Sequence, residues 1–227
     1  MAESASYLLL CDIFDTLPAE LFIHCILPHV ARDWLFVSRF WHPIAFRNIL
    51  VDPRVDPSAN DNNAIQMAAI HGYVKLVELL IAHPRVDPAA NYNNAIHSAA
   101  VHGHVKIVEL LLAHPRVDPA TKYNFVIRSA AFYGRDNVVE LLLGDKRVNP
   151  ASDEQYAIRL AATRGHLKVV KLLLADVRVN PAAQNNDAIR GASRNGQWEV
   201  VKLLLADPRV NLTVEEYAIL KSHFAIM

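Results

Sequence analysis

The residues of this sequence best able to do chemistry are its eleven histidines and two cysteines. Imidazole and thiolate groups bind transition metals, and an imidazole beside a nucleophile acts as a general base. The spacing favours neither role, because His102 and His104 are two residues apart and face different ways on a helix, and Cys11 and Cys25 form no Cys-x-x-Cys pair. The sequence also lacks a glycine-rich phosphate loop and a nucleophile elbow. We therefore expect a protein without metal, cofactor or catalytic activity.

Composition and charge narrow the class of protein. Lys and Arg number 23 and so do Asp and Glu, whereas binders of nucleic acid or acidic membranes usually carry a basic excess. The two cysteines suggest no disulfide framework, which indicates a reducing compartment. The first residues have neither the basic start of a signal peptide nor an apolar run long enough to span a membrane. We expect an intracellular protein, cytoplasmic and/or nuclear, that binds neither nucleic acid nor membrane.

The histidines recur because the sequence itself recurs. The pair Arg-Val returns every 31 residues from residue 54 to residue 209, and five of the seven glycines keep the same interval. Nine of the twelve prolines flank the Arg-Val pair, whereas the other three all precede residue 50. A period of this length is typical of stacked helical units. The recurring histidines are therefore expected to serve packing.

One unit, residues 94–114, predicts two short helices joined by a tight turn. Asn94 is a favoured N-cap type, and Gly103 can take the left-handed conformation that closes a helix. The helix after the glycine is apolar on nearly every side except at Lys106 and Glu109. Such a helix must be covered on more than one side, so each unit is expected to shelter the next.

The stretch NAIHSAAVHGHVKIVELLLA resembles the ankyrin repeat consensus T-P-L-H-x-A-A-x-x-G-H-x-x-V-V-x-L-L-L, and His97 and His104 match its two histidines. The resemblance implies an all-α, ankyrin-repeat solenoid of five short repeats over residues 51–212, closed by a C-terminal helical cap over 213–227. The period of 31 is shorter than the usual length of about 33. Asparagine, which tolerates positive φ, stands near the place of the usual hairpin glycine. These asparagines are Asn62, Asn93, Asn124 and Asn186.

The segment 15–50, which follows an N-terminal segment 1–14, departs from this pattern. It contains LPAEL at 17–21 and VSRFW at 37–41, and so resembles the F-box motif, whose frame is L-P-x-E-L … V-C-R-x-W. The two halves lie closer together than usual, and a serine replaces the cysteine. The residues that the resemblance assigns to folding this small helical domain or docking an adaptor are Leu17, Pro18, Leu21, Ile26, Val37 and Trp41.

F-box proteins bind a Skp-type adaptor through this domain and hold a ubiquitin-ligase substrate on a second domain. The resemblance therefore implies a substrate-recognition subunit of a Skp–cullin–F-box ubiquitin ligase, monomeric outside that complex, with its target protein on the concave ankyrin face. The alternative is an ankyrin scaffold without any link to ubiquitin. In that case residues 15–50 only cap the solenoid.

Partner-binding residues are expected where the repeats differ on their exposed surface. In ankyrin arrays the hairpin tips and the two residues before the turn glycine line the concave side, and aromatic and arginine side chains dominate protein–protein hot spots. We predict an aromatic patch in the second and third units and a basic stripe over the later ones, suited to an acidic peptide. The predicted residues are Tyr92, His102, Tyr123, Arg128, Phe132, Tyr133, Arg159, Arg164, Arg190 and Arg194. A structural alternative is that the tyrosines pack on neighbouring hairpins and the arginines pair with Glu154 and Asp187.

Overall fold

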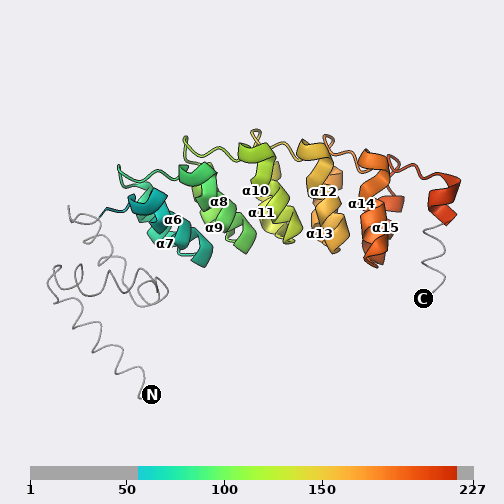
Figure 1. The fold of residues 1–227 in the computed structure, drawn as a ribbon, viewed down its shortest axis with the longest axis horizontal. Coiled ribbons are helices and arrows are strands. Elements are labelled where there is room, and N and C mark those ends of the chain that lie inside the picture. The colour runs from blue at the N-terminus through green and yellow to red at the C-terminus, as the bar shows by residue number, and fades with distance from the viewer. Residues whose placement is uncertain (1–55, 219–227) are drawn as a thin grey trace, which may run out of the picture.

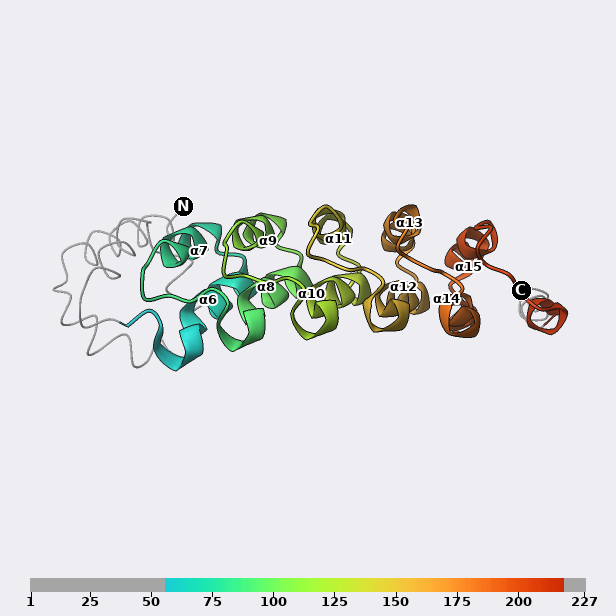
Figure 2. The same cartoon turned by 90° about the horizontal axis from the view of Figure 1, so that it is seen from above.

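The computed structural model describes residues 56–218, which form a row of helix–turn–helix units (Figure 1). Seen from above, the first and second helices of the units lie in two separate rows (Figure 2). The first helices are α6 (Ala59–His71), α8 (Ala90–His102), α10 (Thr121–Phe132), α12 (Ser152–Arg164) and α14 (Ala183–Arg194). The second helices are α7 (Val74–Ile81), α9 (Val105–Leu112), α11 (Asp136–Leu143), α13 (Leu167–Ala175) and α15 (Trp198–Leu205). Residues 56–218 contain no strand, and the expected all-α solenoid is confirmed.

The F-box-like segment 15–50 and the preceding residues 1–14 lie outside the described residues. The start of the expected C-terminal cap is described, and a helix begins there at residue 214. The hydroxyl of Thr213 accepts a hydrogen bond from the backbone N–H of Glu216 at 3.2 Å, and the Glu216 carboxylate accepts one from the N–H of Thr213 at 2.8 Å. This reciprocal capping box fixes where the helix starts.

The core runs through the array between the two rows of helices. In the second repeat Ile107, Val108 and Leu111 of α9 are fully buried against Ala99 and Ala100 of α8 and against the neighbouring repeats. The small alanines let the two helices approach closely. Because α9, α11 and α13 are each covered by their own first helix and by a second helix on both sides, none of these repeats buries its apolar surface alone.

The repeats begin with an unusual turn, a run of three residues in the left-handed helical region. Four of the five runs end in the asparagines singled out from the sequence, and Asn93, for example, has φ of 62°. Gln155 takes this place in the fourth repeat, with φ of 64°. The prediction of Asn94 as an N-cap is wrong, because Asn94 lies inside α8, directly after the left-handed run, and its amide donates to the side chain of Gln66 at 2.7 Å.

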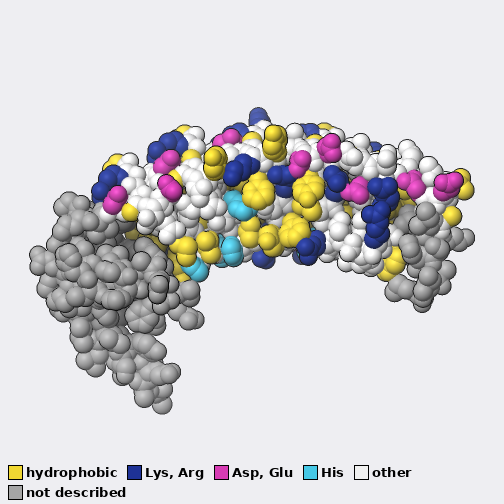
Figure 3. Space-filling model, in the orientation of Figure 1, with side chains coloured by type: hydrophobic (Ala, Val, Ile, Leu, Met, Phe, Trp, Pro, Cys, Tyr) yellow, Lys and Arg dark blue, Asp and Glu magenta, His cyan; other side chains and the backbone are white. Residues whose placement is uncertain are grey.

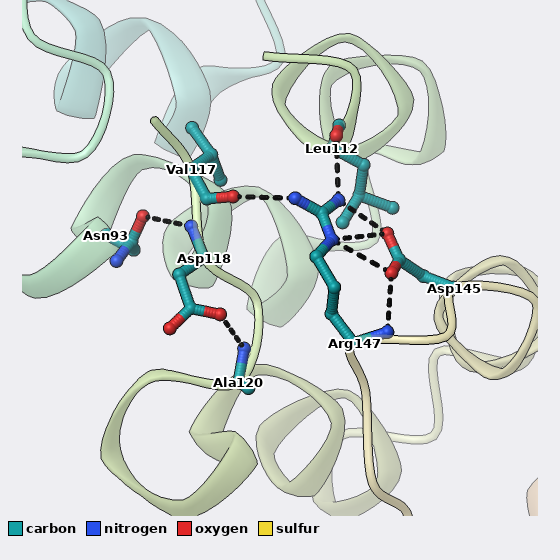
Figure 4. Close-up of polar contacts among 7 residues, drawn as sticks. All are labelled: Asn93, Leu112, Val117, Asp118, Ala120, Asp145 and Arg147. Carbon is teal, nitrogen blue, oxygen red and sulfur yellow. Dashed lines mark hydrogen bonds and ion pairs between the residues drawn. The ribbon is translucent and has the colours of Figure 1, made fainter. Parts of the chain in front are cut away.

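The last residue of the left-handed run ties neighbouring repeats together. The Oδ1 of Asn93 accepts a hydrogen bond from the backbone N–H of Asp118, in the next repeat, at 3.0 Å (Figure 4). Equivalent bonds of 2.7 Å run to Asn62 and Asn124. Asparagine therefore recurs here for two reasons, because it tolerates positive φ and because its short amide reaches the adjoining loop.

The repeated Arg-Val pair forms a second tie between neighbours. Arg147 donates from Nη1 to the carbonyl of Val117 at 2.9 Å and from Nη2 to the carbonyl of Leu112 at 2.8 Å, both in the preceding repeat (Figure 4). Asp145 holds the guanidinium in place with an ion pair of 2.6 Å. The valines of four pairs are buried, namely Val86, Val117, Val148 and Val179, whereas Val210 is half-buried. The interval of 31 residues thus places one arginine at each joint.

The turn glycines all have positive φ, and at Gly72, Gly134 and Gly165 a close neighbour also leaves no room for a side chain. Gly103 closes α8 in the left-handed region with φ of 81°, as the sequence predicted. At Gly72, a Cβ would lie 2.6 Å from the ring of His104, which reaches back and donates through Nε2 to the carbonyl of Ile70 at 3.0 Å. His104 therefore serves packing between repeats.

Candidate protein-binding face

The row formed by α6, α8, α10, α12 and α14 presents one continuous surface, which we call the first-helix face. Hydrophobic side chains, arginines and lysines gather on it over α10 and α12 (Figure 3). The exposed aromatic side chains of these two helices include Phe125 at 41%, Tyr156 at 37% and Tyr133, directly after α10, at 49%. Large exposed rings on rigid helices are favourable contact residues for another protein.

The two tip tyrosines stand at the start of α8 and α10, in the left-handed runs. Tyr123 is 78% exposed and Tyr92 is 68% exposed. The ammonium of Lys122 lies 4.1 Å from the ring centroid of Tyr92, which limits the movement of that ring. Both predicted tip residues are therefore accessible to a partner.

Two repeated positions on the first helices contact each other across every joint. Position A holds Gln66, His97, Arg128, Arg159 and Arg190. Position B holds Asn63, Asn94, Phe125, Tyr156 and Asp187. The residue at position A of one repeat meets the residue at position B of the next, and we call this series the inter-repeat ladder.

The chemistry of the ladder changes along the array. The first joint is an amide pair at 2.7 Å, formed by Gln66 and Asn94. The second is a stack of His97 on Phe125, with ring centroids 4.3 Å apart. At the third, the guanidinium of Arg128 lies 5.5 Å from the ring centroid of Tyr156. The fourth is the ion pair of Arg159 with Asp187, given below.

Burial changes the protonation of the ladder's histidine. His97 is half-buried under Phe125 and hydrogen-bonded to the hydroxyl of Ser129 at 3.0 Å. Burial lowers the pKa of His97, and the positive charges of Lys122 and His102 lower it further. A neutral ring at this joint packs against Phe125 without an unpaired buried charge.

The arginines at position A are largely neutralised by carboxylates. Arg128 forms an ion pair with Asp153, and Arg159 forms one with Asp187 at 2.7 Å. Arg190 lies 3.6 Å from the same Asp187 carboxylate. Pairing with Asp187 agrees with the structural alternative drawn from the sequence, whereas Glu154 contributes only its backbone carbonyl to Arg159. Burial would raise the pKa of Asp187, but the hydrogen bond and charge of Arg159 outweigh it and the pKa is lowered.

The remaining predicted residues lie near the glycine turns. Arg164 ends α12 with its guanidinium 4.1 Å from the ring centroid of Phe132. Arg194 ends α14 and is exposed. His102 is exposed too, although its Nδ1 donates to the carbonyl of Ser98 at 2.9 Å. Each of these side chains reaches the surface at the same end of the first helices.

Phe125 and Tyr156 were not predicted from the sequence. The available signal was the variation at position B, which reads Asn, Asn, Phe, Tyr and Asp from the first repeat to the fifth. The residues predicted from the sequence came from the hairpin tips, from position A and from the two residues before each glycine. The structure brings the position-B aromatics together with Arg128 and Arg159.

Other kinds of site find little support within the described part of the chain. Residues 56–218 contain no group of three or more His, Cys, Asp or Glu side chains placed to hold a metal ion. None of the helices described there is long and apolar enough to cross a membrane. The predicted adaptor-binding residues, from Leu17 to Trp41, lie outside the described residues.

Comparison with known protein families identifies the repeats. The sequence model for "Ankyrin repeats (3 copies)" matches residues 40–123 and 127–215, which together make up well over half of the chain. No curated protein matches the sequence. The family match begins within the F-box-like segment and includes Trp41.

Proposed function

This chain belongs to the ankyrin repeat family, whose arrays are protein–protein interaction modules, and from this premise we propose that it binds a partner protein on its first-helix face. The observation that carries the proposal is the pair of exposed rings, Phe125 of α10 and Tyr156 of α12, which lie beside arginines that already have carboxylate partners. The rings supply apolar contact area, and the paired arginines hold them in place at little additional cost.

The residues that join neighbouring repeats are different from those exposed on the first-helix face. Three features join neighbouring repeats: the asparagine that ends a left-handed run, the Arg-Val pair and the turn glycine. None of them has to change when a residue at position A or B changes. Binding residues held on helices are also placed more accurately than residues on loops. The face can therefore vary from repeat to repeat without loss of the fold.

Affinity capture followed by mass spectrometry tests this proposal. Full-length wild type is compared with Phe125→Ala/Tyr156→Ala and with the control Val177→Ala/Val214→Ala, which removes apolar atoms that are 94% and 88% exposed outside the ladder. We expect the ladder variant to lose the principal partner and the control to retain it. Capture of the same proteins by all three chains, with unchanged thermal unfolding, would refute the proposal.

A more specific role rests on the N-terminal sequence. We propose that the chain is the substrate-recognition subunit of a Skp–cullin–F-box ubiquitin ligase, because LPAEL at 17–21 and VSRFW at 37–41 precede the binding array. The family match favours the alternative for residues 40–50, since it counts them with the repeats. Trp41 is thus assigned to the repeats by the cap interpretation and to the F-box by the adaptor interpretation. Only the adaptor interpretation gives a role to the LPAEL stretch.

Binding to a purified Skp adaptor separates the two interpretations. An F-box predicts a complex with the wild-type chain that is lost in Leu17→Asp/Pro18→Ala, with no change in the unfolding of the repeats. A cap predicts no complex. Deleting residues 1–48 then lowers the stability and solubility of the array instead of abolishing adaptor binding.

A further inference from the structure

The five arginines of the predicted basic stripe divide into two groups. Those at position A pair with Asp153 or Asp187, as described above. Arg164 and Arg194 differ, because both are exposed and the guanidinium of neither forms an ion pair or hydrogen bond with any residue between 56 and 218. Among these five arginines, the guanidiniums without a carboxylate partner therefore lie at the glycine-turn end of α12 and α14.

Arg164 is held in a fixed position although it has no carboxylate partner. Its guanidinium lies over Phe132 at 4.1 Å, and the ring of Phe132 packs edge-on against Tyr133 with centroids 4.9 Å apart. A stacked guanidinium loses less conformational entropy on binding than a free one, and its planar N–H groups match both oxygens of a carboxylate. Tyr133, at 49% exposure, adds an apolar surface beside this cation.

We propose that Phe132, Tyr133 and Arg164, together with Arg194 at the same end of the next first helix, bind an acidic segment of the partner protein, in which carboxylate side chains lie beside an apolar one. The carboxylates pair with the two guanidiniums, and the apolar side chain packs on Tyr133. This inference rests on the proposed function and names the chemistry of the partner at one end of the first-helix face.

A nucleic acid fits this patch less well than an acidic peptide. A phosphate backbone gains affinity from a long run of cations, whereas the same two helices also carry Asp153, Glu154 and Asp187. Base stacking needs a free aromatic face, and Arg164 already occupies one face of Phe132. A short acidic segment needs only the two guanidiniums and the adjoining ring.

Fluorescence anisotropy with the full-length chain tests the proposal. The probe is a labelled peptide of repeated Glu-Glu-Leu, and the comparison peptide is repeated Gln-Gln-Leu. We expect binding of the glutamate peptide alone, weakening as salt rises. Arg164→Glu/Arg194→Glu should weaken it at least about tenfold, because two charge-assisted contacts become repulsive.

The matched control places the same charge changes on the second helices. Lys171→Glu/Lys202→Glu alters exposed residues of α13 and α15 that occupy one repeated position in neighbouring repeats, and it should leave the affinity unchanged. Equal weakening by the control, equal binding of the glutamine peptide, no binding of the glutamate peptide, or tighter binding of single-stranded oligothymidine would each overturn the inference.

The captured partner distinguishes this inference from the proposed function. Suppose that Phe125→Ala/Tyr156→Ala loses the partner while Arg164→Glu/Arg194→Glu retains it. The first-helix face then remains the binding face, and the acidic-segment inference fails. Retention of the partner by both variants would refute the proposed function itself.

Discussion

The first two repeats and the two that follow share one framework and differ in what they present to a partner. At the joints within both regions, an asparagine at the end of the left-handed run accepts a hydrogen bond from the next repeat, as Asn62 and Asn124 do at 2.7 Å. The ladder differs, with an amide pair at the first joint and a guanidinium on an aromatic ring at the third. Residues that hold neighbours together are thus constant, whereas residues exposed beside them are free to carry recognition.

The largest expected loss of stability comes from a charge placed in the hydrophobic core, which runs through both regions. Leu111 has no exposed surface, and a charge there has no partner. Leu111→Glu should lower the free energy of unfolding by about 4 kcal/mol or more, measured by urea denaturation. Lys106→Glu on the same helix should change it by no more than about 0.5 kcal/mol, because that side chain is 59% exposed and loses only an exposed ion pair with Glu109. Equal effects from the two substitutions would mean that α9 is oriented differently.

Substitution of a turn glycine should give the next largest loss of stability. Gly134 has φ of 66°, and an added Cβ would lie 2.5 Å from the ring of His166. Gly134→Ala should lower the free energy of unfolding by about 2 kcal/mol. Gly144 lies in the same repeat with φ of −72° and its nearest Cβ contact at 3.4 Å, so Gly144→Ala should leave stability unchanged or slightly higher. A loss at Gly144 matching that at Gly134 would contradict this account.

The hydrogen bond that the asparagine at the end of a left-handed run accepts from the next repeat predicts a stabilising substitution in the fourth repeat. Gln155 replaces the asparagine there, and its Oε1 is buried without a hydrogen-bond partner. The Nε2 of Gln155 donates to the carbonyl of Arg178 at 3.3 Å, so only the bond accepted by the amide oxygen is missing. Gln155→Asn should restore that bond and raise the free energy of unfolding by about 1 kcal/mol. The reverse change, Asn124→Gln, should lower it by a similar amount. Thermal unfolding of the two variants measures the contribution of this tie, and a shift in the same direction for both would show that the amide length is unimportant.

The smallest expected effect is a pH dependence at the joint between the second and third repeats. Because the folded-state pKa of His97 lies below the ordinary value of 6.5, the unfolded chain binds a proton that the folded chain does not. Stability should therefore fall as pH drops below about 6.5. His97→Gln should flatten the fall between pH 7.5 and pH 5.5 in urea titrations, whereas an unchanged slope would remove His97 as its cause.

Much of the framework could be predicted from the sequence, because its determinants are local. The glycine at the end of each first helix and the asparagines that tolerate positive φ are properties of single residues, and Gly103 and Asn93 behave accordingly. The run of three left-handed residues could not be predicted, since Tyr92 and Lys122 have no preference for that region and the hydrogen bond at the end of each run is made with the next repeat.

The binding face was less predictable, because it depends on contacts between repeats. Residues 97 and 125 stack across a joint, and no pattern within a single repeat shows which sides of α8 and α10 meet. The same reason explains why Asp153, and not Glu154, pairs with an arginine through its carboxylate. Aromatic residues at position B could have been noticed only by comparing the repeats column by column.

Site-specific photo-cross-linking tests the central claim most directly. A benzoylphenylalanine placed at Phe125 reports what approaches the ladder, and the same group at Val177, which is 94% exposed in the loop after α13, reports what approaches another exposed surface. If the partner lies on the first-helix face, a cross-linked protein forms from position 125 and not from position 177. Cross-linking of the same protein from position 177 alone would contradict the account.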